Sequence, residues 1–169
     1  MDAVGKIFSV IVVVFAIFFV PIILMSTTKD EVTQSVVYNI TADFVDNVRA
    51  QGYVSQDQYL EFVSALDNTG ELYDINMTHS HEIVTPVYEN GEVVGTKTSE
   101  DCYYSDDILA QVYETNGAYF MNQGDTFSVE VSLKNKTLAQ TMRQSVLGYV
   151  EESSPIYVVY GGVIRDENF

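Results

Sequence analysis

The sequence predicts an α+β protein in which a long N-terminal α-helix carries a mostly antiparallel sheet with short helices. Three observations lead to this prediction. An apolar run without formal charge, IFSVIVVVFAIFFVPIILM, spans Ile7 to Met25. The chain then continues from Thr28 to Gln51 without Gly or Pro, with its apolar residues at helical spacing. From Glu71 on, apolar and polar residues alternate as in strands, and Asn90-Gly91 separates two extended runs as in a two-residue hairpin.

The apolar run has the length of a membrane span. Its nineteen residues would reach about 28 Å as a helix, close to the hydrocarbon thickness of a bilayer. A cleaved signal peptide would have a shorter apolar run followed by an Ala-x-Ala-like cut site, which the sequence STTKD after Met25 lacks. We therefore expect an uncleaved transmembrane helix, in preference to a signal peptide or a buried core helix. The residues expected to pack this helix in a membrane or an assembly are Phe8, Ile11, Phe15, Phe18, Pro21, Ile22 and Met25.

Charges around the run say little about its orientation. Asp2 and Lys6 precede it, whereas Lys29, Asp30 and Glu31 follow it. The positive-inside rule therefore gives almost no indication of the orientation. The short leader is a poor candidate for the working part of the protein, and the residues after the run suffice for one ordinary domain. We therefore expect a single-pass membrane protein with a cytoplasmic N-terminus and a C-terminal domain outside the cell membrane, at the cell surface.

The second half of the long helix is predicted to be amphipathic. Its apolar residues fall on one face, interrupted by Asp43 and Asn47, and the segment closes with Arg49 and Gly52. The sequence thus divides into a leader and transmembrane helix at 1–25, an amphipathic helix continuing the rod at 26–52, and an extracytoplasmic α+β head domain at 53–169. The residues expected to form the apolar face of the rod are Val32, Val36, Ile40, Phe44 and Val48.

Shorter patterns predict the elements of the head. Ser55 stands three residues before Gln58, a capping box that starts a helix ending near residues 67–70. A strand of about eight residues follows, then the hairpin, in which Pro86 is expected at an edge or bulge. The remaining expectations are a short helix capped by Ser105, a strand with Phe127, Val129, Val131 and Leu133 on one face, a helix from Thr137 to Gly148, and a last strand in PIYVVYGGVI.

Composition and motifs exclude several function classes. Eight Lys and Arg against 24 Asp and Glu give a net charge of −16, which excludes a nucleic-acid partner for lack of a basic surface. Cys102 is the only cysteine, so we expect no internal disulfide, and either a buried position for Cys102 or an occasional bridge between chains. The sequence contains no nucleophile elbow, phosphate loop or dinucleotide motif. We expect no enzyme activity and no cofactor.

His79 and His81 are the one pair with possible metal-binding spacing. They stand two apart on a predicted strand, so both side chains should point to the same face. No further Cys, His or well-placed acid completes a ligand set in the sequence, and a solvent-facing pair is the preferred interpretation. The segment DNTGELYD, residues 67–74, lacks the acid spacing of an EF-hand, and calcium is the less favoured alternative there.

A helix that runs from an apolar into an amphipathic half and carries an α+β head is the layout of type IV pilins, and Pro21 strengthens the comparison. More closely, the segments FVDNVRAQGYVSQDQYLEFVSALDNTGELYDINMTH and YVVYGGVIRDE resemble TadE-like, minor-pilin-like proteins of tight-adherence (Tad/Flp, type IVb-like) pilus loci in Gram-positive bacteria. The resemblance implies a structural subunit of a surface filament or of a secretion apparatus, with a role in cell adhesion. Its implied partners are the bilayer, copies of itself or other pilin-like subunits, and the pilus assembly platform.

The chain departs from type IV prepilins at the processing site. Those proteins are cut after a Gly and carry a Glu five residues into the mature chain, whereas here Gly5 precedes Lys6 and the first Glu is Glu31. The departure favours a subunit that is unprocessed or processed differently. The alternative function is a single-pass, membrane-tethered ectodomain that binds or senses an extracellular ligand.

Overall fold

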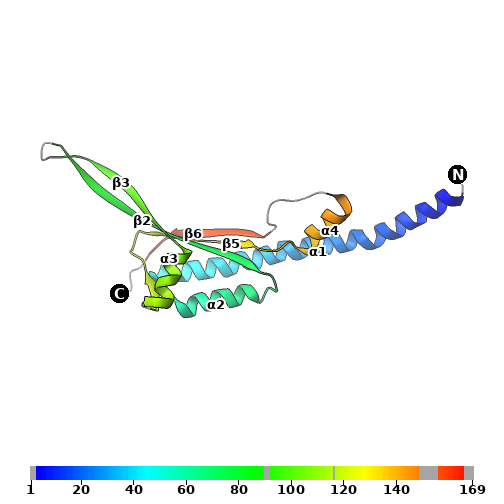
Figure 1. The fold of residues 1–169 in the computed structure, drawn as a ribbon, viewed down its shortest axis with the longest axis horizontal. Helices are drawn as coiled ribbons and strands as arrows, with labels where there is room; N and C mark the ends of the chain where they lie inside the picture. The colour runs from blue at the N-terminus through cyan, green and yellow to red at the C-terminus, as the bar shows by residue number, and fades with distance from the viewer. Residues whose placement is uncertain (1–2, 90–91, 116, 149–155, 166–169) are drawn as a thin grey trace.

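The computed structural model describes residues 3–89, 92–115, 117–148 and 156–165. A long helix runs beside a sheet whose strands extend along it, and two strands project beyond the sheet as a ribbon (Figure 1). The elements are α1 (Ala3–Gln51), β1 (Tyr53–Ser55), α2 (Gln56–Asp67), β2 (Tyr73–Glu89), β3 (Glu92–Tyr104), α3 (Ser105–Ala110), the π-helical turn η1 (Gln111–Thr115), β4 (Ala118–Phe120), β5 (Thr126–Leu133), α4 (Leu138–Leu147) and β6 (Tyr157–Val163).

Helix α1 is continuous over 49 residues, and Pro21 lies inside it. The proline ring removes one backbone donor and leaves the carbonyl of Ile17 without its helical partner. The helix nevertheless does not end there, so the apolar and amphipathic halves form the single rod that the sequence predicts.

The buried face of α1 differs in part from the predicted one. Phe44 and Val48 are buried as expected, and Val37 and Val45 join them against the sheet. Ile40 is only partly buried and lies toward α2. Val32 and Val36, which also belong to the predicted apolar face, are 58% and 41% exposed. They lie beside the C-terminal end of α2, in a shallow groove with Ala65, Asn68 and Thr69. The reason is that α2 ends at Asp67, too early to cover them.

The sheet is antiparallel throughout, with strand order β3-β2-β5-β6. Strand β5 alternates as predicted: Phe127, Val129, Val131 and Leu133 are buried in the core, which lies between the sheet and α1. The rings of Phe44 and Phe127 meet edge to face at 6.4 Å. The alternate β5 residues, Ser128, Glu130 and Ser132, are only half-buried. The described sheet therefore has one buried face, which is usual for antiparallel sheets.

Strand β2 is much longer than expected. It pairs with β5 only from Tyr73 to Ser80, and from His81 to Glu89 it pairs with β3 alone. We call this two-stranded part, 81–89 with 92–101, the arm (Figure 1). Pro86 stands in the arm next to a register shift at Val87/Tyr88, as predicted for a proline at a free edge. The Asn90-Gly91 turn lies outside the described residues.

The helix caps follow the sequence with one exception. Ser55 with Gln58 and Thr137 with Gln140 form complete capping boxes, and Gly148 closes α4 in the left-handed conformation at φ 63°. The exception is Ser105, which was expected to cap α3. Tyr104 holds the cap position, and the Ser105 hydroxyl accepts a hydrogen bond from the backbone N–H of Met77 at 2.7 Å.

Candidate functional site

The apolar half of α1 projects from the head. It is long and apolar enough to cross a membrane, and most of its large side chains are exposed. The predicted packing residues Phe8, Ile11, Phe15, Phe18, Ile22 and Met25 are all exposed, and Pro21 is exposed among them.

Those six large residues share one side of the helix. At 100° per residue they fall within a sector of about 100°, which widens to about 120° when Val32 and Val36 are included. Past Met25 the same sector holds Lys29, which pairs with Glu71, and apolar residues then return at Val32 and Val36, which are both exposed. It stops being exposed near Ile40, where α2 begins to cover it. We call this surface, from Phe8 to Val36, the apolar stripe.

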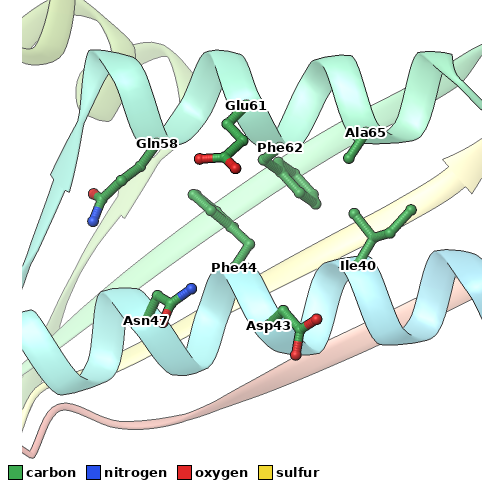
Figure 2. A pocket seen from close by; sticks show the side chains of 8 residues that line it. All are labelled: Ile40, Asp43, Phe44, Asn47, Gln58, Glu61, Phe62 and Ala65. Carbon is green, nitrogen blue, oxygen red and sulfur yellow. The ribbon is translucent and has the colours of Figure 1, made fainter.

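Beyond the stripe, where α2 covers α1, a small open cavity of about 220 Å³ lies between the two helices (Figure 2). Figure 2 shows Phe44 of α1 and Phe62 of α2 reaching toward each other, and their rings stack at 4.3 Å. Asp43 and Asn47, which interrupt the apolar face in the sequence, line this cavity together with Gln58 and Glu61. These polar side chains are accommodated because the space between α1 and α2 is open there. The cavity is too small and open to suggest a ligand.

A buried polar cluster lies at the base of the arm, where β2 leaves β5. His79 and His81 point to the same face, as predicted, and both contact Asp125 just before β5. The His79 Nε2 atom lies 2.9 Å from Asp125 Oδ2, and His81 Nδ1 lies 2.5 Å from Oδ1. The hydroxyl of Tyr119 lies 2.7 Å from His79 Nδ1. The expectation of a solvent-facing histidine pair was wrong for His79, which is 4% exposed, because Tyr119 and Tyr103 pack against its ring.

The electrostatics of the cluster centre on Asp125, which is 3% exposed. Burial alone would raise the pKa of this carboxyl, but hydrogen bonds from His81, the backbone N–H of Asn122 and His79 hold its pKa below the ordinary value. An ionised carboxylate only accepts hydrogen bonds, so each histidine nitrogen that faces it carries a proton. In a neutral ring, His79 Nδ1 then accepts from the Tyr119 hydroxyl. Burial, with the nearby Tyr103 and Asp125, raises the pKa of Tyr119.

The arrangement satisfies its own polar groups. In the described part of the chain no buried side-chain nitrogen or oxygen lacks a partner, and no three His, Cys, Asp or Glu side chains gather as metal ligands there. Asp125 bridges the two histidines, so their nitrogens do not converge on an open point. The cluster is suited to fixing the base of the arm. Sequence patterns missed Asp125 and Tyr119, because both come from a different part of the chain and neither belongs to a motif.

Neither the family models, nor the curated proteins, nor the solved structures include a match to this chain. The features that bear on function are therefore the apolar stripe and the shape of the molecule.

Proposed function

We propose that this protein is a structural, pilin- or pseudopilin-like subunit of a bacterial surface filament or Tad-type pilus or secretion apparatus. In this proposal α1 holds the chain in the membrane before assembly, with its N-terminus in the cytoplasm. The head lies outside the membrane, at the cell surface. Subunits then assemble by packing the apolar stripe against other copies or other pilin-like chains. An adhesive role follows if the assembled heads display their arms to a surface.

The observation that carries the proposal is the extension of the apolar stripe beyond the length of a membrane span. At 1.5 Å per residue, Val32 and Val36 lie about 10 and 16 Å past Met25. A bilayer whose hydrocarbon covers Ile7 to Met25 leaves both valines in water. A simple tether has no use for apolar surface there, whereas a helix that packs lengthwise against its copies does. Exposed apolar surface in line with a larger apolar surface is typical of an interaction site.

The test compares variants of the stripe with a variant of an exposed apolar residue elsewhere. We expect the double variant Val32→Ser/Val36→Ser to remain in the membrane fraction but to lose filaments. Leu60→Ser changes an exposed side chain of α2 and should assemble normally. The measurement is electron microscopy of filaments sheared from cells, with mass spectrometry to detect this chain and to identify its N-terminal residue.

Two outcomes would count against the proposal. One is recovery of this chain only as a detergent-soluble monomer under conditions in which the host makes filaments. The other is normal assembly of the Val32→Ser/Val36→Ser variant. Replacing Ile11, Phe15 and Phe18 by Leu gives an independent check, since it keeps the span apolar but changes its shape.

The alternative, a membrane-tethered ectodomain that binds a ligand, has one observation in its favour. A groove of about 660 Å³ runs between α1 and β6, lined mainly by polar residues such as Gln34, Ser35 and Asn39 together with Tyr38 and Tyr157. The leucine replacements in α1 distinguish the two functions, because a tether would tolerate them and an assembling helix would not.

A further inference from the structure

Helix α4 lies at the end of the head that faces the apolar half of α1. The Thr137 hydroxyl, at the start of α4, donates a hydrogen bond to the Asp30 carboxylate at 2.8 Å. Asp30 is five residues past Met25, about 7.5 Å along the helix. Toward the N-terminus, Ile23, Ser26 and Thr27 are half-buried on the same side of α1. Figure 1 shows α4 beyond the end of the sheet, beside this part of α1. It therefore stands level with the last turns of the apolar run.

The side chains of α4 divide between α1 and the outside. Ala139 and Gln140 are buried. Leu138, by contrast, is 65% exposed, and Met142, one turn later, is half-buried. Leu72 is exposed at the same end of the head, where its carbonyl accepts a hydrogen bond from the backbone N–H of Lys134. We call Leu72, Lys136, Leu138 and Met142 the collar.

Charge plays a secondary part in the collar. The ammonium groups of Lys29 and Lys134 are paired with Glu71 at 2.9 Å and with Asp74 at 3.0 Å. Lys136 donates to the side-chain carbonyl of Gln144, and no ion pair with an acid is found for it among the described residues. The collar therefore offers apolar side chains together with one lysine that has no acidic partner in the described chain. This combination suits the boundary between headgroups and acyl chains, where a lysine can extend to phosphate while its neighbours contact hydrocarbon.

We propose that the collar is a second membrane contact, seated in the lipid headgroup layer of the same bilayer that α1 crosses. The inference rests on the membrane anchoring by α1 in the proposed function. Leu138 and Met142 enter the edge of the acyl region, as amphipathic interfacial helices do to a depth of roughly 5–10 Å. The contact holds the head against the membrane surface and fixes its rotation about α1. Helix α4 faces the side of α1 that carries Asp30, about 100° around the helix from the middle of the apolar stripe, so lipid contact through α4 leaves the stripe free for other subunits.

Fluorescence quenching in liposomes tests the collar on the full-length chain. Cys102→Ser removes the only cysteine, and single cysteines are then placed at Leu138, at Phe18 in the apolar run and at Leu60 on α2, all exposed positions. Each variant is labelled with a small fluorophore in phosphatidylcholine vesicles that contain a lipid with a nitroxide quencher near the headgroup end of its acyl chain. We expect at least about threefold more quenching at Leu138→Cys than at Leu60→Cys, as for a residue in the interface.

The three positions separate the possible failures. Quenching at Leu138→Cys no greater than at Leu60→Cys, with strong quenching at Phe18→Cys, overturns the collar but leaves the anchor in place. A label at Leu138→Cys that is shielded from water at high protein density, yet not quenched by lipid, also overturns it and assigns the surface to a second copy. Absence of quenching at Phe18→Cys removes the anchor itself, and with it the proposed function.

Discussion

Asp125 accepts hydrogen bonds from His79, His81 and the backbone amide of Asn122, although it is almost fully buried. We expect Asp125→Asn to lower the free energy of unfolding by about 1–3 kcal/mol, because an amide replaces the charged acceptor and leaves buried donors poorly paired. The measurement is urea denaturation of the detergent-solubilised chain at neutral pH. Asp67→Asn changes an exposed acid and should have little effect. Equal stability of the two variants would show that the cluster does not hold the base of the arm.

The same residue predicts a dependence of stability on pH. The pKa of Asp125 in the folded chain lies below its ordinary value of 3.8, so the unfolded chain takes up the proton at a higher pH than the folded chain. The contribution of Asp125 is complete above the ordinary pKa and is lost as the pH falls through the lower, folded pKa. We expect the free energy of unfolding of Asp125→Asn to fall less steeply with decreasing pH than that of the wild-type chain below about pH 4. Parallel curves would contradict the prediction.

At the scale of elements, Gly161 and Gly162 decide how closely β6 approaches its neighbours. A Cβ atom at Gly161 would lie 2.5 Å from the Cβ of Ser128 and 2.9 Å from the carbonyl oxygen of Phe127, both on β5. At Gly162 the nearest atom would be the guanidinium carbon of Arg49, at 2.6 Å, which is the end of a flexible side chain. We expect Gly161→Ala to destabilise the chain by about 1–3 kcal/mol and Gly162→Ala by clearly less. Thermal unfolding of both variants measures the two losses of stability. A larger loss for Gly162→Ala than for Gly161→Ala would contradict the prediction.

Elements with strong local signals could be predicted from the sequence. The capping boxes at Ser55 and Thr137, the alternation of β5 and the glycine end of α4 depend on neighbouring residues, so the structure follows them closely. The features that the sequence did not predict depend on residues that are distant in the chain. Val32 and Val36 belong to the apolar pattern, but they are exposed because α2 ends before it can cover them. The three-residue strands β1 and β4 are too short to show a period, and the burial of His79 requires Tyr119 and Asp125 from beyond the arm.

At the scale of the whole molecule, Cys102 offers a direct test of topology. It is exposed on β3, contrary to the expectation of a buried position, because it pairs with Ser80 and so lies on the face of the sheet opposite the buried His79. We expect a membrane-impermeant maleimide to label Cys102 on intact protoplasts. The Cys102→Ser/Lys6→Cys variant should be labelled only after lysis. The opposite pattern would place the head in the cytoplasm and exclude a surface filament.

The strands β5 and β6 extend alongside α1 (Figure 1), and this arrangement determines how the head responds to force. A pull transmitted along α1 acts parallel to these strands and perpendicular to the hydrogen bonds of an antiparallel ladder. The bonds from Thr126↔Val163 to Ser132↔Tyr157 therefore resist together, in shear, instead of opening one after another like a zipper. Tension along the rod would thus be borne by the ladder between β6 and β5, whose alternate residues are buried in the core, while the arm carries none of the load.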